Sequence, residues 1–292
     1  MRIVVPFPPG GGADIIARLL APHLGRALGA SFYVENRSGA AGRIGTGVAA
    51  KAEPDGHTLL VTTESSLVIG PHASPNIGYD PLKDFAPIAL LTRIPILLVV
   101  HPSVPAKTLA DYIALARKNP GEMFFGSSGV GGPNHLAGEM FNRMAGVAIT
   151  HVPFSGTGAA IPAVLSNQVG AVWAFAPGLI PHVRSGALRA LATGGRERSP
   201  ILPDVPTVAE AGVQGFEAVS WIGLLAPAGT PREVIERLWD AVAAAMKDGA
   251  VRKTLLDGGS EIVVSTPAEF RAVTESDYAR YAKLADVFKS EK

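Results

Sequence analysis

Short apolar runs alternate with amphipathic segments along most of this chain. The runs are rich in β-branched residues and bounded by Gly and Pro, a pattern typical of buried strands. They lie at residues 3–5, 31–34, 58–62, 96–100, 123–126, 149–152, 171–175, 187–193 and 220–226. Segments with helical periodicity lie between them, at 14–28, 44–51, 108–118, 135–144, 159–165 and 179–183, and follow them at 231–246, 251–257 and 267–288. This alternation predicts an α/β protein with mostly parallel sheets flanked by helices.

The same pattern predicts two lobes built from a discontinuous chain. At 292 residues the sequence exceeds the usual size of one domain, yet no Ser- and Gly-rich linker or internal repeat divides it. Two long apolar segments, 95–101 and 220–227, are suited to cross between lobes as strands. We therefore expect lobe I at 1–98 plus 223–292 and lobe II at 99–222.

Two helices near the C-terminus have a sequence signal for their first residue. Thr230 and Thr266 each precede a proline, and a glutamate follows each threonine three residues later. This arrangement predicts a threonine N-cap with proline at the first helical position in both helices.

The first candidate binding loop runs from Pro6 to Asp14, after the first strand and before a helix. Three glycines, 10–12, let the backbone approach a ligand, and the helix offers unpaired N–H groups and the positive end of its dipole, which suit a carboxylate. Asp14 is suited either to cap the helix or to bind a ligand ammonium group or water. A tight turn with a helix cap is the other interpretation. The loop lacks both nucleotide motifs, because no Lys follows Gly12 and Ile15 stands in place of the third dinucleotide-motif glycine.

The second candidate loop covers residues 126–135 and again joins a strand to a helix. Ser127 and Ser128 add hydroxyl groups to a flexible glycine backbone and a helix N-terminus. His135 in the first helical turn is either a cap or packing residue, or a ligand contact. Two such loops from two lobes could clamp one carboxylate between them. Weaker candidates are the segments 62–66 and 154–158, whereas 42–45 predicts close helix packing with a solvated Arg43.

Composition and motifs argue against several other functions. A net charge of +1 without a basic run gives no case for nucleic acid or an anionic membrane surface, and the absence of cysteine excludes thiol nucleophiles and thiolate metal sites. The G-x-S-x-G motif is missing and the seven histidines lack zinc spacing. A triad of Ser128, His135 and Asp14 can be imagined but has no further support. No apolar stretch reaches 18 residues, and Met1 leads directly into a strand, so the chain is either cytosolic or a mature form without its signal peptide.

Segments along nearly the whole chain resemble the substrate-binding proteins of tripartite tricarboxylate transporters, the Bug family of periplasmic receptors. Any one segment is a weak signal, but their order is specific. The resemblance lies in residues 5–14, 35–42, 44–45, 54–60, 79–85, 126–139, 152–154, 188–192, 206–212 and 221–231.

This resemblance implies a two-lobed type II periplasmic-binding-protein fold that closes like a hinged trap on a carboxylate in the interlobe cleft. It implies no catalysis, no cofactor and no metal, and a periplasmic, monomeric protein whose signal peptide is absent here. It also implies delivery of the ligand to a two-component membrane permease, with no nucleic acid and no direct membrane insertion. The implied ligand contacts are Phe7, Gly12, Ala13, Asp14, Ser65 and Ser66 in lobe I, and Ser127, Ser128, Gly129, His135, Phe154 and Ala174 in lobe II.

The chain departs from the family pattern at three positions. Gly170 and Ala174 stand where acids are common, and Ser155 stands where relatives often have Lys. The wall at 173–175 is therefore less charged and more aromatic, which favours a ligand with an apolar or aromatic body behind its carboxylate. Two alternatives remain open: a carboxylate-sensing module for a membrane kinase, and a hydrolase or isomerase on the same fold.

Overall fold

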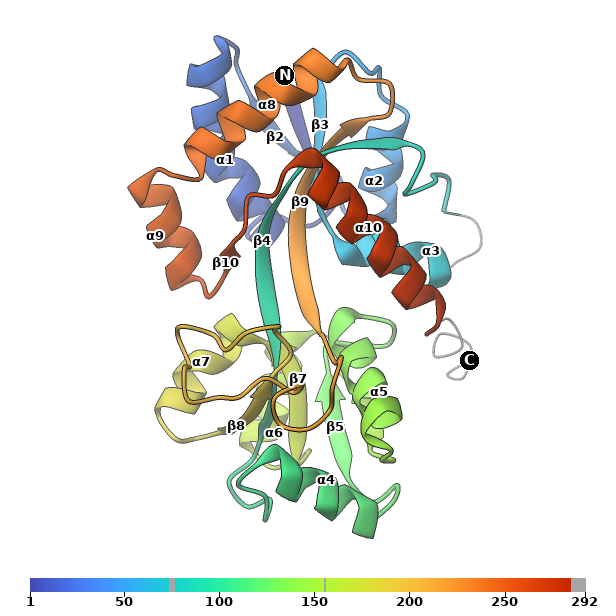
Figure 1. Cartoon of the computed structure of the whole chain (residues 1–292), viewed down its shortest axis with the longest axis vertical. Coiled ribbons are helices and arrows are strands. Elements are labelled where there is room, and N and C mark those ends of the chain that lie inside the picture. Colours follow the sequence, from blue (N-terminus) through green and yellow to red (C-terminus); the bar gives the residue numbers. More distant parts are fainter. Residues whose placement is uncertain (74–76, 155, 285–292) are drawn as a thin grey trace. The chain divides into compact units, whose positions relative to one another are not determined.

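The computed structural model describes residues 1–73, 77–154 and 156–284, which form two compact units (Figure 1). Unit 1 contains Met1–Arg93 together with the described chain from Trp221 onward, and unit 2 contains Ile94–Ser220. Strands β4 (Phe85–Val100) and β9 (Val219–Pro227) each run from one unit into the other. The boundaries expected from the sequence, after residue 98 and before residue 223, lie in these same two strands.

The sheet of unit 1 is mixed. Strand β1 (Arg2–Val5) pairs in parallel with β2 (Tyr33–Asn36) and β3 (Thr58–Thr63), and β3 pairs antiparallel with β9. The strand order is β2-β1-β3-β9-β4, and the two-residue β10 (Glu261–Ile262) pairs antiparallel with β4. Residues 3–5 of β1 have no exposed surface. The continuous apolar run there reflects burial on both faces of the sheet.

Helices cover this sheet, and α1 packs against α8 although more than 200 residues separate them in sequence (Figure 1). The α10 helix begins with the expected capping box, in which Thr266 accepts from the Glu269 amide and Glu269 reaches back to the Thr266 amide. The cap expected at Thr230 is wrong, because the N-cap of α8 is Pro231 and the Thr230 hydroxyl instead donates to the Pro227 carbonyl at 2.8 Å. The helical elements of unit 1 are α1 (Gly12–Leu28), η1 (Ala40–Gly42), α2 (Arg43–Ala50), η2 (Ser65–Ile69), α3 (Gly70–Ala73), α8 (Arg232–Ala245), α9 (Gly249–Asp257) and α10 (Pro267–Ala282).

Unit 2 repeats the arrangement with different strands. Strand β5 pairs in parallel with β6 and β7, while β4 pairs antiparallel with β7 and β8. The strands are β5 (Phe124–Ser127), β6 (Thr150–Pro153), β7 (Ala171–Phe175) and β8 (Arg189–Thr193), and the helices are α4 (Leu109–Lys118), α5 (Pro133–Ala145), α6 (Thr157–Leu165) and α7 (Ala176–Arg184). The predicted α/β class is confirmed. The long strands β4 and β9 supply antiparallel pairs beside the parallel ones.

Two apolar cores lie on opposite faces of β7. Trp173 is 1% exposed and packs with Phe141 and Phe216, at ring-centroid distances of 5.5 and 5.6 Å. Ala174, also 1% exposed, points to the other face and packs with Leu97 and its neighbours. Neighbouring strand residues face opposite sides, so each is a core residue on its own side of the sheet. Within the described ranges, no helix has both the length and the apolar character needed to cross a membrane.

Candidate functional site

The first candidate loop presents bare backbone at the start of α1. Residues 8–12 are exposed, and the N-cap Gly11 has extended backbone angles, φ −76° and ψ 164°, without a side-chain cap. The first amides of a helix lack intrahelical partners. A glycine at the cap therefore leaves the N–H groups of the first turn available to an anion, beside the positive end of the helix dipole.

Asp14 is buried at the end of this loop and holds the loop by hydrogen bonds. Its side chain is 3% exposed and accepts hydrogen bonds from the Gly10 amide, Arg18 Nε and Asn36 Nδ2, each at 2.9 Å. Burial alone would raise the pKa of the carboxyl, but the bonds from Arg18, Gly10 and Asn36 outweigh it and lower the pKa to about 2. The Asp14 side chain therefore connects the glycine loop to α1 and β2 through hydrogen bonds within the protein.

Ser66 and Phe7 lie where β1, α2 and β3 meet. The Ser66 hydroxyl is fully buried and bonded to Thr46 Oγ1 at 3.0 Å and Thr62 Oγ1 at 2.5 Å. A Cβ atom on Gly42 would lie 2.9 Å from Ser66 Cβ and 3.1 Å from the Phe7 ring, so this close approach requires glycine. The close packing that the sequence predicts for residues 42–45 is present at Gly42. Ser66 has a structural role here, whereas Ser65 and Phe7 are partly exposed.

Glu64, between β3 and Ser65, lies in the weaker candidate segment 62–66, but the sequence assigned it no role of its own. It has no exposed surface, and its Oε2 accepts the Trp221 amide at 3.0 Å. The Trp221 indole in turn donates to Asp277 Oδ2 at 2.7 Å, and Asp277 pairs with Arg280. This network ties the segment after β3 to β9 and α10. An acid at the end of an apolar strand was the only sequence signal for it.

The second candidate loop repeats the backbone geometry of the first. The N-cap of α5 is Gly132, with φ −76°, ψ 163° and no side-chain cap. Ser127 at its start is fully buried: its Oγ lies 2.7 Å from His151 Nε2 and accepts the Gly129 amide at 3.2 Å. Ser128 is partly exposed and accepts from Asn134 Nδ2 at 3.1 Å. The structure therefore leaves Ser128, rather than Ser127, as the hydroxyl that faces outward.

His135 lies under this loop as a packing residue. It is 1% exposed, its Nδ1 accepts the Gly131 amide at 3.0 Å, and its Nε2 lies 3.9 Å from Glu139 Oε1. Its ring stacks on His151 with centroids 3.9 Å apart. His151, on β6, is the residue that sequence reasoning missed, because nothing in its local sequence marks it as a neighbour of Ser127.

The remaining expected contacts of unit 2 lie at its edge or in its core. Phe154 is partly exposed, its amide donates to Ser127 O at 3.2 Å, and its ring would lie 3.0 Å from a Cβ on Gly126. Ala174 is a core residue, and Gly170 accepts the His101 amide at 3.0 Å. Ser155 lies outside the described residues.

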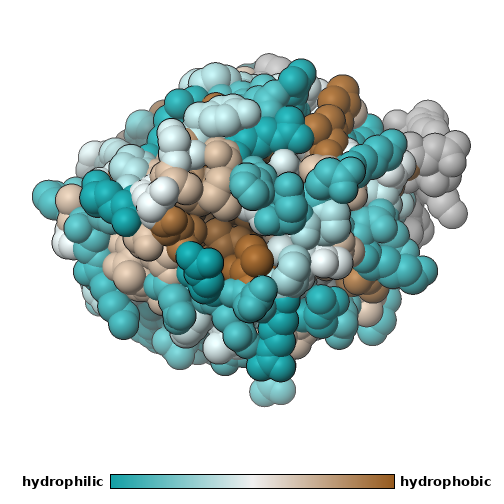
Figure 2. Space-filling view, turned by 90° about the horizontal axis from the view of Figure 1, so that it is seen from above, coloured by the Kyte–Doolittle hydropathy of each residue, from teal (hydrophilic) through white to brown (hydrophobic). Residues whose placement is uncertain are grey.

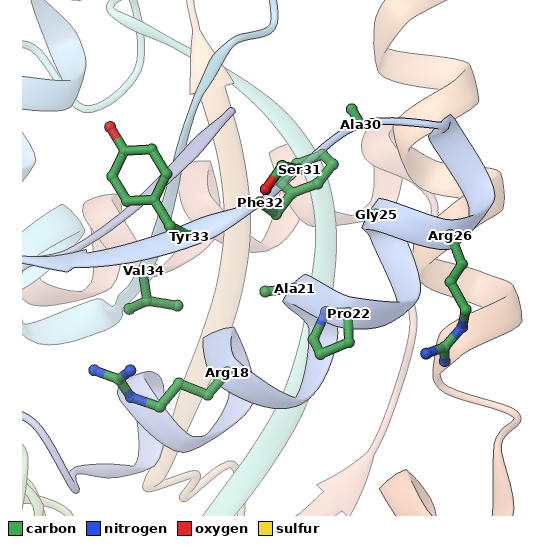
Figure 3. A pocket seen from close by; sticks show the side chains of 10 residues that line it. All are labelled: Arg18, Ala21, Pro22, Gly25, Arg26, Ala30, Ser31, Phe32, Tyr33 and Val34. Atoms are coloured by element: carbon green, nitrogen blue, oxygen red, sulfur yellow. The ribbon is translucent and has the colours of Figure 1, made fainter.

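A large surface pocket lies elsewhere on unit 1. It has a volume of about 690 Å³ and is formed by one side of α1 and by β2, with Arg18 and Arg26 on α1 and Phe32 on the opposite wall (Figure 3). Its lining includes none of the twelve expected ligand residues. The face seen from above is mostly polar, with separate apolar patches near the centre left and at the upper right (Figure 2). Backbone amides suited to an anion lie in the two glycine loops, so we treat each loop as a candidate site in its own unit.

The hydrolase interpretation gains no support from this geometry. In the imagined triad, Asp14 is bonded to Gly10, Arg18 and Asn36, and His135 Nδ1 accepts from Gly131. The serine–histidine pair of the second loop, Ser127 with His151, places its hydroxyl in a fully buried position. A nucleophile must reach its substrate, and this one has no exposed surface.

Known proteins resemble the chain along nearly its full length. BugT of Bordetella pertussis is 37% identical over 283 residues, covering 97% of this chain and 87% of BugT. The structure of an R. palustris protein with adipate superposes with a TM-score of 0.80 at 36% identity, covering 99% of this chain and 97% of that one. MatC from Rhodopseudomonas palustris, with bound malate, gives a TM-score of 0.79 at 33% identity and covers 98% of both chains. The profile of the tripartite tricarboxylate transporter family receptors matches residues 16–287, and this chain belongs to that family.

Proposed function

We propose that the protein is a periplasmic, non-enzymatic receptor that captures a small carboxylate and delivers it to a two-component membrane permease. The observation that carries this proposal is the pair of glycine N-caps, Gly11 and Gly132, whose backbone angles agree within 1° and whose helices both lack a side-chain cap. Ser, Thr, Asn and Asp lead at this position in most helices. Glycine in their place leaves the first-turn amides for an external anion.

In unit 2 a ligand carboxylate is received by the first-turn amides of α5 together with the Ser128 hydroxyl, and in unit 1 the first-turn amides of α1 offer the same kind of donor. Ser128 Oγ accepts from Asn134, so its own hydrogen is free to donate to a carboxylate oxygen. Adipate and malate, the ligands of two relatives in the same family, carry such groups. The protein acts as a monomer, without a cofactor, on this proposal.

We further propose that the ligand has an apolar body. The aromatic wall expected at 173–175 does not carry this idea, since Trp173 and Ala174 are core residues. Exposed aliphatic side chains in or directly after the candidate loops support it instead: Ile15 is 42% and Val130 52% exposed. Exposed apolar groups beside polar donors are typical of ligand-binding surfaces.

A thermal-shift screen against carboxylates, followed by titration calorimetry, tests the proposal. A ligand at about 100 times its Kd stabilises the folded protein by about 2.7 kcal/mol, a melting shift of a few degrees for a chain of this size. The series should include acetate through hexanoate, C4–C6 diacids, benzoates and acidic amino acids. Affinity should rise about fourfold for each methylene that is buried. Exclusive binding of aspartate or glutamate would contradict the apolar body, and no binding in the whole series would contradict the receptor.

Matched variants at the two glycine caps test the site. Gly11→Asp and Gly132→Asp place a good capping residue where a Cβ atom meets its nearest neighbours at 3.5 Å or more, so folding should persist. The added carboxylate occupies the free amides and repels the ligand, so affinity should fall at least tenfold. Gly11→Asn and Gly132→Asn cap equally well without the charge and should retain more affinity. Affinities of the Asp and Asn variants that all equal that of the wild type would remove the loops from the site.

A further inference from the structure

Two histidines from different elements form a stacked pair beneath the second loop. His135 comes from the first turn of α5 and His151 from β6, with ring centroids 3.9 Å apart and an interplanar angle of 24°. The Phe125 ring also lies near His151, with ring centroids 5.1 Å apart. The rings are thus held in place by packing before any polar contact is considered.

The two rings hold alternate residues of the loop. His151 Nε2 lies 2.7 Å from Ser127 Oγ, and that oxygen accepts the Gly129 amide at 3.2 Å. His135 Nδ1 accepts the Gly131 amide at 3.0 Å. The pair therefore bonds the loop at Ser127 and Gly131, and the Ser127 hydroxyl in turn bonds both the amide and the carbonyl of Gly129.

Part of this loop reaches the surface. Ser128 is partly exposed and Val130 is 52% exposed. Gly129 and Gly131 have φ values of +123° and +74°, a conformation that other residues adopt with strain. A loop with this much glycine is flexible unless it is held, and ordering a flexible loop on binding reduces affinity.

We propose that His151 is a positioning residue for the carboxylate site. Through Ser127 it fixes the loop so that the Ser128 hydroxyl and the first amides of α5 are already arranged for the ligand. The inference rests on the proposed receptor function and assigns a role to a residue that no ligand needs to touch.

Substitutions that separate stacking from hydrogen bonding test this role. His151→Phe keeps an aromatic ring against His135 and Phe125 but removes the histidine partner of Ser127 and leaves that hydroxyl with Gly129 alone. We expect about a tenfold rise in Kd for the best carboxylate, with little change in melting temperature. His151→Gln offers a polar group to Ser127 and should recover part of the affinity. A residue that only fills space would show the reverse order, with Phe tolerated and Gln damaging.

Two further variants keep the test decisive. Ser127→Ala removes the same hydrogen bond from the other side, so its effect on Kd should not add to that of His151→Phe. If His151→Phe does not fold, the Kd of Ser127→Ala is compared with that of the wild type in its place. His101→Phe is the control, because His101 Nδ1 lies 2.7 Å from Ser103 Oγ in a similar pair outside the candidate loops, and its Kd should equal that of the wild type.

The outcomes separate the two proposals. If wild-type protein binds no carboxylate, the receptor function fails. If wild-type protein binds but His151→Phe and Ser127→Ala bind equally well, the receptor stands and the positioning role of His151 is overturned.

Discussion

At the scale of single residues, Asp14 links the shape of the first loop to pH. Its pKa of about 2 lies below the ordinary value of 3.8, so the folded state favours the ionised form. A depressed carboxyl pKa stabilises the fold fully above about pH 4, and this stabilisation is lost as the pH falls through about 2. The shift corresponds to about 2 kcal/mol at most.

Asp14→Asn should therefore lower the free energy of unfolding by about 1–2 kcal/mol at pH 7, because an amide accepts the Arg18 and Gly10 bonds more weakly. Denaturant unfolding between pH 7 and pH 2 checks this, and the gap from wild type should narrow as the pH falls below 4. Asp240→Asn, at an exposed position on α8, is the control and should behave like the wild type. An equal gap at every pH would contradict the linkage.

At the scale of elements, two helical glycines should respond to alanine with opposite signs. A Cβ on Gly138 of α5 would lie 2.2 Å from the buried Phe125 ring, so Gly138→Ala should cost about 1–3 kcal/mol of stability. Gly158 of α6 is exposed with nothing within 4 Å, so Gly158→Ala should stabilise by about 0.5 kcal/mol. Thermal unfolding of both variants checks the contrast, which depends on how closely α5 packs on β5. Two changes of the same sign would show that helix propensity outweighs this packing.

At the scale of the whole molecule, the continuous strands β4 and β9 connect the two units. The contacts divide β4 between Arg93 and Ile94, next to Pro95, which has no amide to donate to a strand neighbour. Hinged closure of such units around a ligand is a common response in binding proteins. We expect the radius of gyration measured by small-angle X-ray scattering to fall when a saturating carboxylate is added. An unchanged radius with a bound ligand would argue against closure.

Much of the architecture could be predicted because it depends on local pattern. The strand–loop–helix order, the α10 cap at Thr266 and the two glycine loops follow from apolar periodicity and turn residues near one another in sequence. The Thr230 cap is wrong because α8 begins at Arg232 with Pro231 as its N-cap, one residue later than expected, and the Thr230 hydroxyl donates to Pro227 O. The local sequence alone does not show which hydrogen-bond partner a side chain will have in the folded protein.

The sequence by itself determined the fold class, the family and the presence of two loops with free helix amides, because glycines, prolines and apolar runs act on their own neighbourhood. Tertiary structure decided which side chains those loops leave to a ligand. It buried Ser127 and Ser66, left Ser128 partly exposed, and brought His151 to within 2.7 Å of a serine 24 residues away. It also placed Trp173 and Ala174 in cores. The physical reason is that burial and hydrogen-bond partners are set by parallel strands that meet only after the chain has folded.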